Sequence, residues 1–113
     1  MSTLHPKIKI WLAKDDTGFF GPGTLKLLKQ TAKLQSLKAA CACMGMSYSK
    51  GWKIITNIER ELGFAVLKRR QGGRFGGGCV PTAEGEAMME RYEAFAEHAA
   101  KLVSDAFTEF FGT

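Results

Sequence analysis

Residues 36–63 read SLKAACACMGMSYSKGWKIITNIERELG and contain two helical patterns separated by a glycine. Ser36 and Ser47 stand directly before the two patterns, where a serine hydroxyl can accept a hydrogen bond from the free backbone N–H groups of a helix. Gly45 and Gly63 follow the patterns, where a left-handed C-cap is expected. This stretch therefore predicts a short helix, a sharp turn and a longer helix.

The two helices predicted over 37–44 and 47–62 have the features of a helix-turn-helix. Ala40, Cys41 and Gly51 are small enough for two helices to cross closely. The apolar residues expected to face inward are Leu37, Met44, Met46 and Ile54. In the longer helix, Trp52, Ile55, Ile58 and Leu62 recur at helical spacing. Helical hairpins unrelated to DNA share this spacing, so the pattern alone leaves the function open.

Upstream, residues 7–12 alternate polar and apolar side chains, residues 15–18 supply turn chemistry, and two phenylalanines follow. We therefore expect an N-terminal β-hairpin. Gly-Pro-Gly at 21–23 should end its second strand, and Thr24 should cap a helix over 24–33.

Downstream, residues 64–67 favour a strand, residues 68–78 are basic and rich in glycine, and Cys79 and Val80 indicate a returning strand that ends at Pro81. This second hairpin stands where a winged helix-turn-helix has its wing. Glycines let the backbone approach a DNA strand closely while cations reach phosphates or the minor groove. The cations are Lys68, Arg69, Arg70 and Arg74. The alternative interpretation is a disordered glycine loop.

A long final helix is predicted over 82–111, capped by Thr82, with Glu84 and Glu86 near the positive end of its dipole. Its apolar residues advance by steps of three and four, which gives a narrow seam of the coiled-coil kind. They are Met88, Tyr92, Phe95, Ala99, Leu102, Ala106 and Phe110. We expect this seam to pair two copies in a homodimer; the alternative is packing against the chain's own first helices.

The open face of the helix near 48–56 carries hydroxyl, amide and ammonium groups, which bond phosphates and base edges in a major groove. The candidate DNA-binding residues there are Ser47, Tyr48, Ser49, Lys50, Lys53, Thr56 and Asn57. Capping alone is the alternative for Ser47, and plain solvation is the alternative for the two lysines. Trp52 is expected to be partly buried.

No enzyme chemistry is expected. A nucleotide-binding loop of the Walker type requires Gly-Lys, then Ser or Thr, then a helix, whereas Gly78 is followed by Cys79 and a strand. The sequence also offers no positioned histidine, no paired carboxylates on a predicted pocket and no nucleophile motif.

Charge is segregated along the chain. Residues 1–75 contain 14 Lys and Arg against 4 Asp and Glu, a balance of +10, while residues 76–113 contain 2 against 7, a balance of −5. Clustered cations favour a polyanion because neutralised phosphates release counterions, although a solvated surface would give the same counts.

A length of 113 residues, 45% of them hydrophobic, fits a single domain over 1–113, with a hairpin, three helices and the wing in 1–81 and a dimerisation helix in 82–111. We expect a cytoplasmic protein, since residues 1–12 lack the apolar run of a signal peptide and no stretch approaches the roughly 20 apolar residues of a membrane span. Three cysteines and two distant histidines fit free thiols and no zinc-ligand spacing, so we expect no metal and no cofactor.

Four motifs carry a family resemblance: GMSYSKGW at 45–52, IERELG at 58–63, GGRFGGG at 72–78 and TAEG at 82–85. Together they resemble the N-terminal domain of ModE-type molybdate-responsive transcription regulators, winged helix-turn-helix domains of the wider LysR-like class. The resemblance implies a prokaryotic regulator that dimerises through its terminal helices and places two recognition helices in successive major grooves.

Three departures modify what the resemblance implies. The full-length regulators carry C-terminal oxyanion-binding domains, for which the chain leaves no room, so direct molybdate binding is not expected. Gly51 stands where the family usually has alanine, which should weaken the helix by up to about 1 kcal/mol. Phe75 interrupts the usual glycine-lysine wing.

The expected fold is α+β, mainly α: a winged helix-turn-helix with an N-terminal β-hairpin and a long C-terminal dimerisation helix. The expected function is sequence-specific binding of double-stranded DNA by a transcription regulator without an effector domain. The alternatives are a winged-helix module for dimerisation or protein interaction without sequence-specific DNA reading, and an oxyanion-responsive switch.

Overall fold

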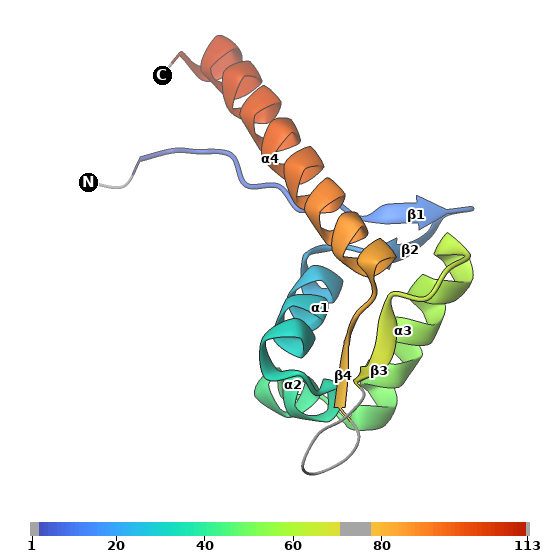
Figure 1. The fold of residues 1–113 in the computed structure, drawn as a ribbon. Coiled ribbons are helices and arrows are strands. Elements are labelled where there is room, and N and C mark those ends of the chain that lie inside the picture. The colour runs from blue at the N-terminus through green and yellow to red at the C-terminus, as the bar shows by residue number, and fades with distance from the viewer. Residues whose placement is uncertain (1–2, 71–77, 113) are drawn as a thin grey trace.

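The computed structural model describes residues 3–70 and 78–112. Within them the elements follow the order β1 (Leu12–Lys14), β2 (Thr17–Phe20), α1 (Pro22–Leu34), α2 (Leu37–Cys43), α3 (Tyr48–Leu62), β3 (Leu67–Arg70), β4 (Gly78–Pro81) and α4 (Ala83–Phe111). Figure 1 shows the first three helices and the β3–β4 hairpin packed together, with α4 projecting from them as a long rod. The predicted winged helix-turn-helix with a long C-terminal helix is confirmed.

The core lies where α1, α2 and α3 meet the two hairpins and the start of α4. Its largest fully buried side chains include Phe20, Leu27, Leu28, Leu37, Ile55, Ile58 and Val66. Tyr92 anchors α4 to this core, because the centroid of its ring lies 5.0 Å from that of the Phe20 ring. Its hydroxyl also donates a 2.6 Å hydrogen bond to the carbonyl of Ile10. Burial raises the pKa of Tyr92, which keeps this hydroxyl a donor.

The N-terminal hairpin exists, but its first strand is β1 rather than the predicted 7–12. Asp15 and Asp16 both have positive φ, 47° and 69°, and form the tight turn that pairs Lys14 with Thr17. With the register fixed at the turn, residues before Leu12 would need partners after Phe20, where the chain already enters α1. The alternation over 7–12 therefore has no opposing strand.

Helix α1 begins at Pro22, two residues before the predicted start. Thr24 is not the N-cap; it lies in the first turn, where its hydroxyl accepts a 2.6 Å hydrogen bond from the N–H of Gly21 and donates a 2.8 Å bond to the Gly21 carbonyl. At the other end, Gln35 adopts a left-handed φ of 56°, and its carbonyl accepts a 3.2 Å bond from the N–H of Cys79. The end of α1 is thereby joined to β4.

The predicted helix-turn-helix is confirmed with its caps. The hydroxyl of Ser36 accepts a hydrogen bond from the N–H of Ala39, and that of Ser47 accepts one from Lys50. Gly63 ends α3 with φ of 81°.

Gly51 lies at the close crossing of α2 and α3, as its small size predicted. A Cβ atom at this buried position would overlap the sulfur of Cys41, which is itself almost fully buried. Glycine therefore does more than weaken α3: it gives the Cys41 side chain room at the crossing of α2 and α3.

The first strand of the wing begins later than predicted, and the second begins one residue earlier, at Gly78. Residues 64–66 are not a strand, and β3 instead includes Lys68, Arg69 and Arg70, paired antiparallel with β4. The reason is tertiary: the carbonyl of Val66 accepts a 2.9 Å hydrogen bond from the N–H of Thr82, and a Cβ atom on Gly85 would overlap the same carbonyl. The backbone of Val66 thus contacts the first turn of α4 and does not pair in the β3–β4 hairpin.

Thr82 caps α4 as predicted, accepting a 2.9 Å hydrogen bond from the N–H of Gly85. The predicted dimerisation seam, however, divides into two parts. Met88 and Tyr92 are buried in the chain's own core, so the prediction that these two residues lie in a dimer interface is wrong. Phe95, Leu102, Ala106 and Phe110 are exposed, and Ala99 is half-buried. Among the helices described, none combines the length and apolarity needed to cross a bilayer.

We predict that Gly51→Ala lowers the free energy of unfolding by about 1–2 kcal/mol, because the overlap with Cys41 outweighs the better helix propensity of alanine. The measurement is urea denaturation at equilibrium. Combining it with Cys41→Ala should remove the overlap, so that the double variant is more stable than the sum of the single changes predicts.

Gly23→Ala is the matched control, since a Cβ atom there meets nothing within 4 Å. It should leave stability unchanged or slightly increased. Equal effects of Gly51→Ala and Gly23→Ala would contradict a tight crossing of α2 and α3.

Candidate nucleic-acid interface

The outer face of α3 displays the polar groups predicted for it. Ser47, Tyr48, Ser49, Lys50, Lys53 and Thr56 are exposed, and Asn57 is half-buried. They point outward because Gly51, Ile55 and Ile58 occupy the opposite face and are buried. Helix geometry thus separates the side chains that hold α3 in place from those free to meet a ligand.

Two hollows flank this face. The first, of about 450 Å³, lies between α2, α3 and the β3–β4 hairpin. It is lined by Ser36, Leu37, Lys38, Tyr48, Trp52, Leu67, Lys68, Arg69, Gly78 and Cys79. The second runs along α3 and is lined by Tyr48, Ser49, Trp52, Lys53, Ile54, Thr56, Asn57 and Arg60. Among the described residues no carboxylate lines either hollow, so both present only neutral or positive groups.

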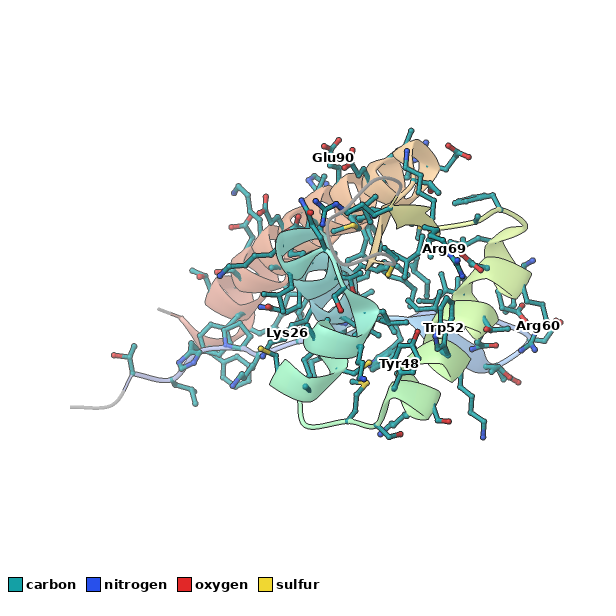
Figure 2. All side chains as sticks on the ribbon, turned by 60° about the horizontal axis from the view of Figure 1, so that its bottom comes forward. Lys26, Tyr48, Trp52, Arg60, Arg69 and Glu90 are labelled. Carbon is teal, nitrogen blue, oxygen red and sulfur yellow. The ribbon has the colours of Figure 1, made fainter. Side chains whose placement is uncertain are left out.

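Tyr48 and Trp52 line both hollows and form a ridge between them. Their rings meet edge to face, with centroids 6.1 Å apart and planes at 74°. They stand 46% and 41% exposed, so Trp52 is a surface residue despite its helical spacing with Ile55. Figure 2 shows both rings on the same side of α3, with Arg69 of β3 nearby.

Two cations of the hollows were not among the sequence candidates. Arg60 lines the second hollow, and its guanidinium donates hydrogen bonds to Oδ1 of Asn57 and, over 3.3 Å, to Oε1 of Glu61. Its spacing of seven residues from Lys53 is the signal that could have found it. Lys38 lines the first hollow from α2, and only the fold brings it beside β3.

The predicted wing cations are placed in part. Lys68 and Arg69 line the first hollow, and Arg70 is exposed on the same strand. Arg74, Phe75 and the glycines at 72–77 lie outside the described residues. Lys50 is exposed but lines neither hollow, so the structure does not group it with the other candidates.

Glu59 fixes the position of β3 relative to α3. Its Oε2 accepts hydrogen bonds from the N–H groups of Val66, at 2.8 Å, and Leu67, at 3.3 Å. A carboxylate that accepts two backbone N–H groups makes charge-assisted bonds, which are stronger than neutral ones. The wing therefore starts at a defined distance from the outer face of α3.

The three cysteines are free thiols, as expected. Burial raises the pKa of Cys41 and of Cys79, so both stay protonated at neutral pH. Neither thiol is activated as a nucleophile or a metal ligand by its surroundings.

Residues 23–86, which run from α1 through the helix-turn-helix and the wing to the first turn of α4, match the family described as bacterial regulatory helix-turn-helix proteins of the lysR family. The chain belongs to the LysR family. In this LysR-family chain, the matched region includes both hollows and every described DNA-binding candidate.

Curated relatives agree with this family and with the ModE-type resemblance. The chain is 32% identical over 84 residues to the molybdenum-pterin-binding protein MopB of Rhodobacter capsulatus, covering 74% of this chain and 31% of the relative. It is 29% identical over 94 residues to the DNA-binding transcriptional dual regulator ModE of Escherichia coli K12, covering 83% of this chain and 36% of the relative. The LysR-family chain thus spans about a third of these relatives.

Solved structures support the fold. The structure described as the CbnR_DBD-DNA complex has a TM-score of 0.58 at 22% identity and covers 77% of this chain and 94% of its own. Full-length CbnR complexed with its target DNA has a TM-score of 0.57 at 23% identity, covering 76% of this chain and 28% of its own. At these identities the likeness shows that the LysR-family chain shares their fold.

We predict that Glu59→Ala lowers the free energy of unfolding by about 1.5–3 kcal/mol, since it leaves two backbone N–H groups without their charged acceptor. Thermal and urea unfolding measure this loss. Glu61→Ala is the matched control: Glu61 is next in sequence and its carboxylate pairs with Arg60 at the surface, so its loss should cost about 0–1 kcal/mol. Equal costs would show that Glu59 does not hold the wing.

Proposed function

We propose that this chain is a DNA-binding module of a transcription regulator, which reads double-stranded DNA with the outer face of α3 and contacts the backbone with β3. The observation that carries the proposal is the pair of hollows beside α3, which combine cations and hydrogen-bonding groups without a lining carboxylate. Such a surface suits a polyanion, because each phosphate neutralised by lysine or arginine releases counterions.

The two hollows suit different parts of a duplex. Ser49, Lys53, Thr56 and Arg60 follow one another by steps of three and four and form one stripe along α3. A helix of this kind fits the major groove, where such side chains bond base edges. Lys38, Lys68 and Arg69 lie to the side of the stripe, across the first hollow, where they would meet the phosphate backbone.

The names of the relatives support this proposal. One relative is called a DNA-binding transcriptional dual regulator, and the structural neighbours were solved as complexes with DNA. The aligned part of each relative corresponds to the fold that carries the two hollows in this chain. Molybdenum is mentioned only in the name of one of these relatives, and molybdate binding is not part of the proposal for this chain.

We also propose that two copies pair along the outer part of α4. At about 1.5 Å per residue its 29 residues extend about 44 Å, much further than the core that buries its first turns. Beyond Ala96 the apolar side chains Leu102 and Phe110 are 58% and 80% exposed. A seam of this kind is stabilised when a second helix covers it, which would set two α3 helices on one side of a duplex.

Selection of bound sites from random duplex DNA tests the DNA-binding proposal. We expect enrichment of a two-fold symmetric sequence whose affinity falls steeply with salt. Arg69→Ala should reduce the slope of log affinity against log salt by about 1 for each copy bound, and Lys53→Ala should weaken the selected site more than random DNA.

Lys26→Ala is the matched control, because Lys26 is an exposed lysine of α1 that lines neither hollow (Figure 2). The DNA affinity of this variant and its slope against salt should equal those of the unchanged protein. An equal loss in the Lys26 and Lys53 variants would mean that general charge, not the face of α3, binds DNA. Failure to enrich any duplex would favour a protein-interaction module.

We predict that Leu102→Glu shifts the chain from dimer to monomer in sedimentation equilibrium at micromolar concentration, because it places a charge in the apolar seam. Ser104→Glu adds the same charge on the opposite side of α4 and should leave the dimer intact. A monomer without any substitution would contradict pairing along α4.

A further inference from the structure

Tyr48 is a candidate for DNA binding through its hydroxyl group, but the contacts proposed so far use charge and hydrogen bonding and give no role to the paired rings of Tyr48 and Trp52. The two residues lie one helical turn apart and keep 46% and 41% of their surface exposed. Their edge-to-face packing holds the rings together as one apolar ridge. Ile55 and Ile58, on the same helix, are fully buried, so the exposure is a property of this ridge and not of all apolar residues in α3.

The ridge lies where base edges would pass. It occupies the first half of α3 and separates the hollow beside the wing from the hollow along the helix. In a helix-turn-helix bound to DNA, the first residues of the recognition helix approach the base edges in the major groove. The ridge would thus face bases, with Ser49 and Lys53 on one side and Lys68 and Arg69 on the other.

One group in the major groove is apolar and projects from a base edge: the 5-methyl group of thymine. We propose that Tyr48 and Trp52 form a contact site for thymine methyl groups and so determine a preference for thymine in the bound sequence. This inference rests on the proposed DNA-binding function. The edge-to-face geometry favours a methyl contact over sandwiching of an unpaired base, which would need two parallel ring faces.

The experiment replaces each thymine of the selected duplex by uracil, one at a time, and measures affinity at fixed salt. Uracil lacks the methyl group but keeps every hydrogen-bonding group and the base pairing. We expect affinity to fall about fourfold at one or two positions in each half-site, the equivalent of burying one methyl group. Thymines elsewhere should tolerate the exchange.

The protein variants identify the side chains that sense the methyl group. A Tyr48→Ser, Trp52→Gln double variant should bind the thymine and uracil duplexes equally, with the salt slope unchanged because no cation is lost. Tyr48→Phe keeps the ring and should keep the discrimination. Trp11→Gln is the matched control, since Trp11 is an exposed tryptophan that packs on the first hairpin and lines neither hollow.

Three results would overturn the inference. The first is equal affinity of the unchanged protein for thymine and uracil at every position; specific duplex binding would then leave the DNA-binding proposal standing. The second is discrimination that survives in the double variant, which would place the methyl contact elsewhere. The third is tighter binding to the single strand than to the duplex, lost in the double variant, which would make the ridge a stacking platform. Absence of any duplex binding would overturn the proposed function itself.

Discussion

The close crossing of α2 and α3 determines where the candidate DNA-binding face, the wing and α4 lie. Gly51 has no side chain, so the sulfur of Cys41 can lie against the backbone of α3. This contact decides the rotation of α3 about its axis: with Gly51, Ile55 and Ile58 turned inward, the polar stripe and the aromatic ridge must face outward. A rotation of α3 large enough to bury Lys53 would also expose Ile55, because the two residues lie on opposite sides of the helix, and both changes are costly.

A few specific contacts fix the positions of the wing and of α4 relative to α3. Glu59 binds the backbone at Val66 and Leu67 and places the wing beside the outer face of α3. The Val66 carbonyl accepts a hydrogen bond from the N–H of Thr82 and lies close against the glycine at position 85, where α4 begins. Tyr92 fixes the direction of α4 through Phe20 and Ile10. The seam proposed to pair two copies is therefore held in a fixed relation to the face proposed to meet DNA.

Sequence patterns predicted the features that depend on neighbouring residues. The caps at Ser36, Ser47 and Thr82 were predictable because a cap is set within four residues of its helix. Features that depend on distant residues were not. The alternation of polar and apolar residues over 7–12 has no partner strand. The helical spacing of apolar residues in α4 is the same whether a residue packs in the chain's own core, as Tyr92 does, or faces solvent, as Leu102 does. Arg60 and Lys38 joined the candidate site only once the fold placed them beside the hollows.

We propose that the outer face of α3, together with β3 and the start of α2, is the surface that contacts duplex DNA. Titrating the isotope-labelled protein with its selected duplex, and following backbone amide signals by NMR, tests this claim directly. We expect the largest shifts in the first half of α3, at Lys38, and at Lys68 and Arg69. Largest shifts on the exposed face of α1 or on the outer half of α4, with α3 unaffected, would contradict it.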